Sequence, residues 1–247
     1  MADYPMIIGH RGFPGRYPEN TLVGLLAAAE AGAHGVELDV QISADGVPVV
    51  IHDPDLWRTT GRRGFVFELK AAELKGIGAG EPLRFGERYR GEPIPTLHAV
   101  AEALSAFPGL RVFIEIKWDA PRHQIPDVTK AVLNASQPLG DRRVVIGFDE
   151  RLLQEARSLA DVPIGWALRA WDRFHRERAG TLQPEYLFCD RDYLPLAPEL
   201  LWPGPWQWVV YEINDREEAR KLASRGVTAV ETADVASMLD AEASAER

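Results

Sequence analysis

Eight short apolar runs, separated by longer helix-like stretches, are the feature that most constrains the fold of this 247-residue chain. Short runs rich in Val, Ile and Leu are typical of buried strands, and apolar residues every three or four positions are typical of helices. The predicted strands are Met6–Gly9, Val36–Ile42, Arg111–Ile116, Val144–Gly147, Pro163–Leu168, Tyr186–Cys189, Trp208–Val210 and Val227–Val230. The predicted helices are Asn20–Ala31, Leu97–Ala106, Ile125–Ser136, Glu150–Ala160 and Arg216–Arg225, with weaker patterns elsewhere.

This alternation predicts an α/β protein with a (β/α)8 barrel, because repeated strand–helix units build a parallel sheet covered by helices. The chain length is close to the ~250 residues typical of that barrel. A doubly wound open sheet is the runner-up, but no Gly-x-Gly-x-x-Gly turn follows the first predicted strand. We therefore expect residues 1–247 to form a single barrel domain.

Two segments do not fit the alternation of strands and helices. Asp45-Gly46 is a tight-turn signal, so Val47–Ile51 is expected to fold back on the second strand as a hairpin. Residues 54–94 do not continue the strand–helix pattern and predict a small insertion over one end of the barrel. Connections of this length are usually functional or disordered.

Charge and cysteine content argue against several classes of protein. The formal net charge of -9 disfavours a general affinity for nucleic acid or anionic membranes. Cys189 is the only cysteine, so no intrachain disulfide can form, and a reducing cytosol fits. The chain has neither a signal-peptide pattern nor a run of about 18 apolar residues. We expect a cytoplasmic protein without a membrane span; the sequence leaves its oligomeric state open.

Two carboxylates lie inside the second predicted strand. Glu37 and Asp39 are two positions apart, so both side chains lie on one face of that strand, and Val36, Leu38 and Val40 lie on the other. Adjacent buried carboxylates repel each other and lose hydration, which is costly unless a cation lies between them. This pair therefore indicates a divalent metal ion.

Further polar residues fall at the ends of the neighbouring strands. His10 and Arg11 follow the first strand, His52 ends the hairpin, and Glu115 and Lys117 close the third strand. Barrel active sites collect at the carboxyl ends of the strands, so these side chains are expected to share one pocket with Glu37 and Asp39.

The residue types in this pocket indicate phosphoryl chemistry. Glu37, Asp39 and Glu115 offer three hard oxygen ligands, which suit Mg²⁺ or Ca²⁺ better than Zn²⁺. His10 and His52 can each exchange a proton near neutral pH, one as base and one as acid. The set is completed by fixed positive charge for an anionic substrate, supplied by Arg11 and Lys117.

The order and spacing of these motifs resemble the glycerophosphodiester phosphodiesterase family, most strongly over residues 7–60 and 94–118. The motifs that carry the resemblance are His10-Arg11-Gly12, Pro18-Glu19-Asn20-Thr21, Glu37-Leu38-Asp39-Val40, His52-Asp53 and Glu115-Ile116-Lys117. The resemblance implies a (β/α)8 barrel with a small insertion after the second strand. It also implies metal-dependent hydrolysis of glycerophosphodiesters, small-molecule substrates, to glycerol 3-phosphate and an alcohol.

Carried over by position, the resemblance makes His10 and His52 the acid–base pair. The implied metal ligands are Glu37, Asp39 and Glu115, and the implied phosphate contacts are Arg11 and Lys117. The sequence does not say which histidine acts first as base, or whether water or a glycerol hydroxyl attacks the phosphorus.

Three strand ends depart from the family's usual pattern. The seventh strand ends Tyr211-Glu212-Ile213-Asn214 in place of Trp-Thr-Val-Asn, so Glu212 is unexpected. The eighth ends Glu231-Thr232-Ala233-Asp234 in place of Thr-Asp, and Gly147-Phe148 replaces Ser-Phe at the fourth. These ends line the same mouth, so the preferred alcohol is left open.

Structural roles compete for some of these residues. Lys117 has an alternative role as a counter-ion to Glu115, although its position at a strand end favours substrate contact. Glu19 and Asn20 are expected to organise the first loop and helix cap. Asp53 is expected to orient the backbone or His52, with no chemical step of its own.

Two other functions remain open from the sequence. A related barrel phosphodiesterase acting on lysophospholipids or phosphoinositides would need an apolar entrance. The segments that offer one contain Phe65, Phe67, Leu69 and Ile77. A catalytically silent barrel that only binds an anionic metabolite is the other alternative, and the complete set of two histidines and three carboxylates speaks against it.

Overall fold

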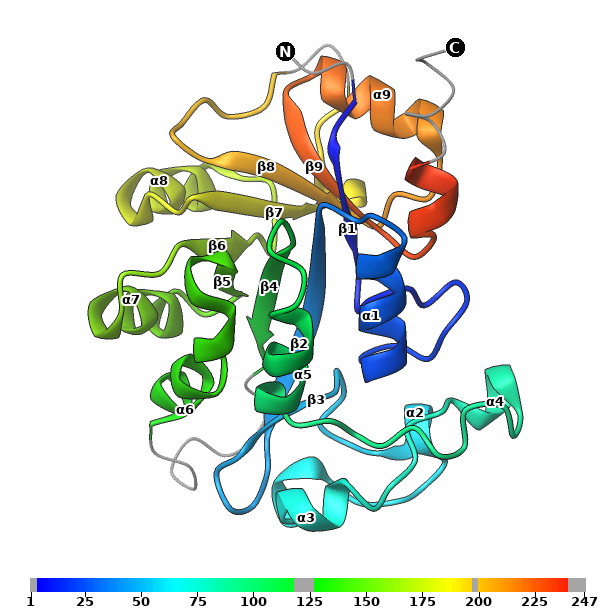
Figure 1. Cartoon of the computed structure of the whole chain (residues 1–247). Coiled ribbons are helices and arrows are strands. Elements are labelled where there is room, and N and C mark those ends of the chain that lie inside the picture. Colours follow the sequence, from blue (N-terminus) through cyan, green and yellow to red (C-terminus); the bar gives the residue numbers. More distant parts are fainter. Residues whose placement is uncertain (1–3, 118–126, 197–199, 240–247) are drawn as a thin grey trace.

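The computed structural model of the protein describes residues 4–117, 127–196 and 200–239. Across these residues, eight parallel strands form a ring, because β1 pairs with both β2 and β9 and each other strand pairs with its neighbours (Figure 1). The ring strands are β1 (Met6–Gly9), β2 (Gly35–Ile42), β4 (Arg111–Ile116), β5 (Arg143–Gly147), β6 (Ile164–Ala167), β7 (Tyr186–Asp190), β8 (Gln207–Tyr211) and β9 (Val227–Thr232). Closure of the ring confirms the predicted barrel and shows that the open-sheet alternative is wrong.

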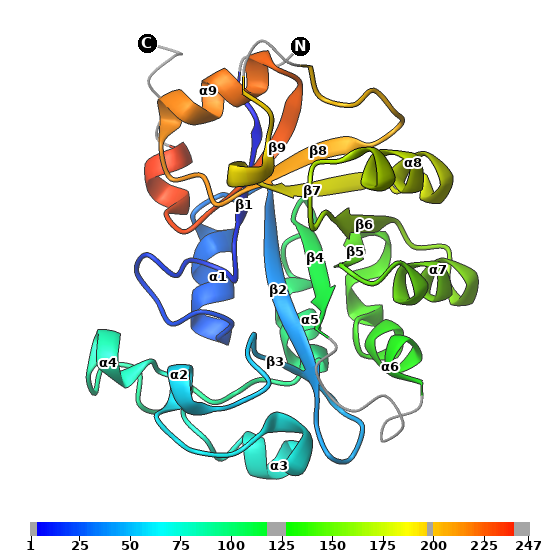
Figure 2. The same ribbon diagram turned by 180° about the vertical axis from the view of Figure 1, so that it is seen from behind.

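Helices surround the ring on its outer side (Figure 2). They are α1 (Leu22–Glu30), α5 (Leu97–Leu104), α6 (Val128–Ala135), α7 (Glu150–Leu159), α8 (Arg173–Leu182) and α9 (Arg216–Ser224), followed by a helical segment over 235–239. The prediction for α6 began at Ile125, and residues 125–126 lie outside the described residues. None of the helices in the described ranges is both long enough and apolar enough to span a bilayer.

Helix α8 was not predicted because only Ala179 and Leu182 are buried along its length, which gives a weak apolar pattern. The connection from β7 to β8 also departs from the strand–helix rule. Its described residues contain only the short 3-10 turn η3 (Arg191–Tyr193). A second 3-10 segment, η2 (Gln137–Arg142), leads into β5.

The period-two alternation of the strands divides the core into two layers. Val36, Leu38 and Val40 of β2 face the helices, whereas Phe113 of β4 faces the inside of the ring. The inner layer comprises Ile8, Phe113, Val144, Ile146, Ala167, Tyr186, Phe188, Val209 and Ala229. Residues at odd positions of β2 therefore point into the barrel, which places Glu37 and Asp39 on its inner face.

The predicted hairpin is confirmed. Strand β3 (Pro48–Val50) pairs antiparallel with the end of β2, with Val40 opposite Val50, and lies outside the eight-stranded ring. Gly46 makes the turn with a φ of 79°, in the left-handed region that glycine adopts without steric cost.

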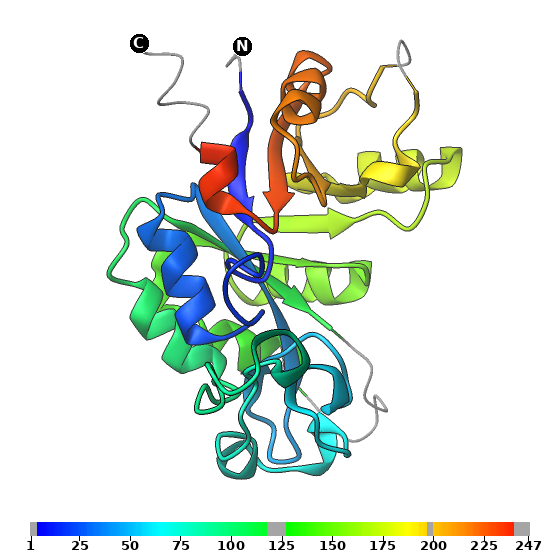
Figure 3. The same cartoon turned by 90° about the vertical axis from the view of Figure 1, so that its right-hand side faces the viewer.

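The insertion over residues 54–94 follows β3 and lies at the opposite end of the molecule from α9 (Figure 3). It contains α2 (Trp57–Thr60), η1 (Val66–Glu68), α3 (Ala71–Leu74) and α4 (Pro82–Phe85). A small apolar cluster joins it to the hairpin. The cluster comprises Val49, Ile51, Leu56, Val66, Leu74, Ile77, Ala79 and Ile94. Packing against Val49 and Ile51 fixes the insertion beside the carboxyl end of β2.

Candidate active site

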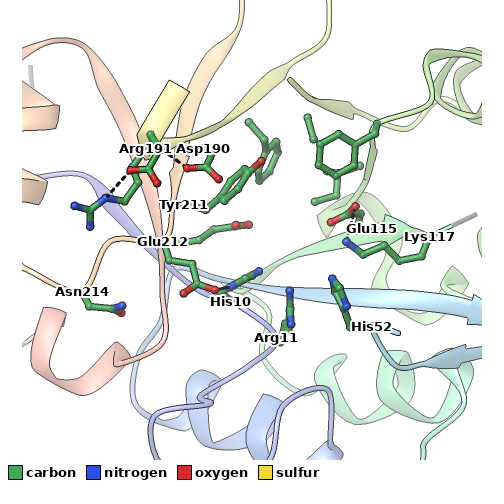
Figure 4. A pocket seen from close by; sticks show the side chains of 16 residues that line it. His10, Arg11, His52, Glu115, Lys117, Asp190, Arg191, Tyr211, Glu212 and Asn214 are labelled. Carbon is green, nitrogen blue, oxygen red and sulfur yellow. Dashed lines mark hydrogen bonds and ion pairs between the residues drawn. The ribbon is translucent and has the colours of Figure 1, made fainter. Parts of the chain in front are cut away.

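A cavity of about 590 Å³ opens at the carboxyl ends of the strands (Figure 4). Five predicted site residues line it: His10, Arg11, His52, Glu115 and Lys117. The other lining residues come from the second half of the barrel and its loops. They are Ile146, Phe148, Ala167, Phe188, Asp190, Arg191, Asp192, Tyr211, Glu212, Asn214 and Glu231.

The three predicted metal ligands converge beneath this cavity. The register of β2 and β4 sets Asp39 opposite Glu115, and Glu37 lies two residues before Asp39 on the same face. One carboxylate oxygen from each of the three lies within 4.8 Å of the others. All three side chains are buried, which is unfavourable for like charges unless a cation joins them.

The electrostatics of Glu37 suit a ligand of a metal cation. Burial and the neighbouring Asp39 carboxylate raise the pKa of Glu37 well above its usual range. Its buried Oε1 atom has no hydrogen-bond partner among the described residues. An unpaired oxygen beside two further carboxylates is a suitable ligand set for a hard divalent ion.

Lys117 and Arg11 supply the nearest positive charge. Lys117 Nζ lies 2.8 Å from Glu115 Oε1 and 3.1 Å from Asp39 Oδ1, and Arg11 Nε lies 3.1 Å from Asp39 Oδ2. Burial alone would raise the pKa of Asp39, but these two cations hold it well below its usual range. Lys117 is thus a counter-ion to the carboxylates and also lines the cavity.

The turn after β1 places both His10 and Arg11. Arg11 and Gly12 have φ values of 56° and 91°, so the chain reverses tightly at these residues. A Cβ atom on Gly12 would lie 2.8 Å from the carbonyl carbon of Gly24 in α1, so only glycine fits. The reversal directs the Arg11 backbone N–H to Glu37 Oε2 at 3.0 Å.

Asn20 has a different role from the helix cap that was predicted for it. Thr21 caps α1, since its Oγ1 accepts from the Gly24 N–H. Asn20 is buried, donates its Nδ2 to Asp39 Oδ2 at 2.8 Å and accepts from the Asp39 N–H at 3.0 Å. It therefore fixes the orientation of a predicted metal ligand.

His52 belongs to a chain of charged groups that reaches into the insertion. Its Nδ1 lies 2.6 Å from Asp53 Oδ1, and Arg58 Nε donates to Asp53 Oδ2 at 2.6 Å. Arg58 also donates to both oxygens of Glu19, at 2.6 and 2.8 Å. Glu19 in turn accepts from Arg11 at 3.1 Å. Arg58 therefore connects the supports of one histidine and one arginine.

His10 lines the same cavity as His52 and is held by a different carboxylate (Figure 4). Its Nδ1 lies 2.8 Å from Glu212 Oε1, and its Nε2 lies 3.8 Å from Glu37 Oε2. Burial lowers the pKa of His10, but the Glu212 hydrogen bond and other nearby carboxylates raise it, with a net increase.

The sequence analysis did not assign Arg58, Glu212 or Glu231 to the site. Glu231 is buried in β9, its Oε1 has no partner among the described residues, and burial raises its pKa to about 7. Both glutamates sit at strand ends, so the positional rule that identified Glu115 applies to them as well. Arg58 has no comparable signal, because it is not at a strand end and its partner Glu19 lies 39 residues away in the sequence.

The apolar entrance considered for long-chain substrates is not found at the cavity. Phe65, Phe67, Leu69 and Ile77 are absent from its lining. Ile77 is buried in the small cluster of the insertion, and Phe65 stacks on Phe67 at a centroid distance of 5.2 Å.

Comparison with known proteins agrees with this geometry. Residues 10–182 match the model of the glycerophosphoryl diester phosphodiesterase family. A glycerophosphodiester phosphodiesterase of Caldanaerobacter subterraneus subsp. tengcongensis is 30% identical over 243 residues, which cover 95% of this chain and 96% of the relative.

Two solved structures are similar across nearly the whole chain. An Oleispira antarctica phosphodiesterase in complex with the product sn-glycerol-3-phosphate has a TM-score of 0.84 at 28% identity, covering 97% of each chain. A glycerophosphodiester phosphodiesterase of Thermotoga maritima has a TM-score of 0.72 at 27% identity, covering 98% of this chain and 100% of that chain. From the barrel, the cavity residues and these similarities, we conclude that the chain is a phosphodiesterase of the glycerophosphoryl diester phosphodiesterase family.

Proposed function

We propose that the protein hydrolyses glycerophosphodiesters to glycerol 3-phosphate and an alcohol, with a divalent metal ion and two histidines. The observation that carries this proposal is the convergence of three carboxylates, one of which lines the same cavity as both histidines and both cationic side chains. The family relationship supports the reaction class.

Glu37, Asp39 and Glu115 would hold the metal ion, either Mg²⁺ or Ca²⁺, because both prefer oxygen ligands. When bound, such an ion neutralises negative charge on the phosphate and the charge that develops during displacement. Arg11 and Lys117, which already lie beside these carboxylates, would bind phosphate oxygens as the substrate enters.

His10 and His52 would carry the two proton transfers. One removes the proton from the attacking oxygen, which then forms a bond to phosphorus. The bond from phosphorus to the alcohol oxygen breaks, and the other histidine donates a proton to that oxygen. The attacking oxygen belongs either to water or to the neighbouring glycerol hydroxyl. In the second case a cyclic phosphodiester forms first, and water then attacks its phosphorus and breaks one ring P–O bond to give glycerol 3-phosphate. Phosphorus NMR during turnover distinguishes the two routes, since only the second produces a cyclic phosphate.

A hydrolysis panel tests the reaction. We expect glycerol 3-phosphate from glycerophosphocholine, glycerophosphoethanolamine and glycerophosphoglycerol with Mg²⁺ or Ca²⁺, and none after EDTA. Faster hydrolysis of lysophosphatidylcholine than of glycerophosphocholine would favour the lysophospholipid alternative. Binding of glycerol 3-phosphate without hydrolysis of any diester would favour the silent barrel.

The metal site has a test that does not depend on activity. Ionised Glu37 is unfavourable in the metal-free fold, because burial and Asp39 raise its pKa. Glu37→Gln should therefore raise the melting temperature of the metal-free protein and remove most of the increase that the metal gives to the wild type. An unchanged metal-induced increase in Glu37→Gln would exclude Glu37 as a ligand.

We also propose that residues 1–247 form one domain that includes the insertion at 54–94. The small apolar cluster shared with β3 and the contacts of Arg58 with Glu19 and Asp53 support this. A single calorimetric transition is expected, with equal calorimetric and van't Hoff enthalpies. Separate melting of the insertion would contradict it.

A further inference from the structure

The Glu212 side chain follows β8 and points to His10. Glu212 and Lys117 lie on opposite sides of the cavity (Figure 4). The Glu212 side chain is 49% exposed and the His10 side chain 12% exposed, so the pair lies at the wall of the cavity with Glu212 on its solvent side. A carboxylate with this much solvent access keeps its charge at neutral pH. It is therefore available as a permanent acceptor for the histidine ring.

The contact involves one specific nitrogen of His10. Glu212 Oε1 lies 2.8 Å from Nδ1, whereas Nε2 lies on the other edge of the ring, 3.8 Å from Glu37 Oε2. An ionised carboxylate can only accept, so Nδ1 must carry a hydrogen. In neutral His10 the lone pair is then on Nε2, the atom nearer the carboxylate cluster.

The backbone of His10 is fixed independently of its side chain. Its N–H donates to the carbonyl of Thr232 in β9 at 3.0 Å, and Arg11 follows in the tight turn described above. The remaining freedom of His10 is rotation of the imidazole ring and the choice of tautomer. The Nδ1 contact with Glu212 restricts both.

We propose that Glu212 is a positioning residue that holds His10 in the Nδ1–H form and presents Nε2 to the substrate. This inference rests on the proposed role of His10 in proton transfer. Glu212 acts through the histidine: it keeps the ring oriented, and its negative charge stabilises the imidazolium whenever Nε2 takes up a proton. The proton moves only between Nε2 and the substrate oxygen, and none is transferred to Glu212.

A second use of Glu212 would produce a different kinetic result. Its partial exposure would also allow it to attract a cationic head group such as choline. Loss of a head-group contact raises KM for cationic substrates alone, whereas loss of a support for His10 lowers kcat for every substrate.

The test compares Glu212→Gln, which keeps an acceptor without the charge, with Glu212→Leu, which removes both. We expect kcat to fall about 10-fold in the first and about 100-fold in the second, because hydrogen bonds to charged groups are worth roughly one to two factors of ten. The KM for glycerophosphocholine and for glycerophosphoglycerol should change by less than about twofold. Glu217→Gln is the matched control, since Glu217 is exposed on α9 and pairs with Lys221 of the same helix.

Nitrogen-15 NMR of labelled histidines provides a readout that a general loss of structure would not mimic. With metal bound, His10, assigned by comparison with His10→Gln, should show an Nδ1–H signal in the wild type and in Glu217→Gln. A substantial Nε2–H population should appear in Glu212→Leu. An unchanged tautomer in Glu212→Leu, or a rise in KM at constant kcat, would overturn the inference. An inactive wild type with the Nδ1–H tautomer would overturn the proposed function and leave the Glu212 contact standing.

Discussion

The two histidines of the cavity are both supported at Nδ1 by a carboxylate, but the supports differ in kind. His52 is paired with the adjacent residue, Asp53, whose side chain is 22% exposed and is also bound by Arg58. His10 is paired with Glu212, which directly follows β8 in the second half of the chain and is 49% exposed. One support is local and held from two sides, whereas the other depends on barrel closure and is open to solvent.

This difference shows that a barrel can build two similar histidine–carboxylate pairs, one from adjacent residues and one from distant strands. The support of His52 is contained in one short motif and is reinforced by the insertion. The support of His10 needs β1 and β8 at the correct separation, which β9 between them sets. Substitutions at the two supports should therefore have unequal effects on catalysis and on stability.

The largest effect is expected from removing either histidine. His10→Ala and His52→Ala should each lower kcat for glycerophosphocholine by about 10²- to 10⁴-fold, the usual contribution of a general acid or base. Glycerol 3-phosphate release gives the rate, and calorimetric binding of glycerol 3-phosphate serves as the control for an intact pocket. Wild-type activity in either variant would contradict the proposed mechanism.

Asp53→Asn should lower kcat by about 10- to 100-fold, more than Glu212→Gln, because the substitution weakens the contacts to both His52 and Arg58. The measurement is kcat at saturating substrate for the two variants side by side. Glu68→Gln, an exposed position of the same insertion, is the charge-matched control. A smaller loss of kcat in Asp53→Asn than in Glu212→Gln would contradict the view that the support of His52 is the stronger one.

Arg58→Lys should lower kcat by about tenfold, since lysine keeps the charge but cannot reproduce the fork that bridges Glu19 and Asp53. The nearby Arg62 is exposed, and Arg62→Lys should have wild-type kinetics. The His10 tautomer should be unchanged in Arg58→Lys. Equal rates in the two lysine variants would show that Arg58 does not support the site.

The smallest expected effect concerns stability. Arg58→Gln should lower the free energy of unfolding by about 1 kcal/mol, because Arg58 is only partly exposed and its partner Glu19 is buried. Glu212→Gln should change it by less than about 0.5 kcal/mol, as expected for an exposed side chain. Urea unfolding of the metal-free variants measures both changes. A larger loss of unfolding free energy in Glu212→Gln than in Arg58→Gln would contradict this prediction.

The parts of the molecule that were predictable are those controlled by local periodicity. Alternation along β2 and β4 places Glu37, Asp39 and Glu115 inside the barrel, and parallel pairing brings Asp39 opposite Glu115. The hairpin at Gly46 also follows from a local turn signal. Helix α8 was missed because it is largely polar, which weakens any apolar pattern.

The unpredicted contacts depend on tertiary geometry. Asparagine is a residue type that often caps helices, yet the side-chain amide of Asn20 binds Asp39, and Thr21 caps α1 instead. Arg58 contacts Glu19 only because the insertion folds back toward the turn after β1. Glu212 stands out in the sequence as a charged strand end, but its partner His10 is set by ring closure.

The most direct test of the central claim is the kcat of the double variant His10→Ala/His52→Ala beside each single variant, with glycerophosphocholine and saturating Mg²⁺ or Ca²⁺. Two groups that act in one reaction cycle are strongly non-additive, so the double variant should be about as slow as the slower single variant. Losses that multiply in the double variant would contradict the claim that both histidines serve one proton-transfer cycle.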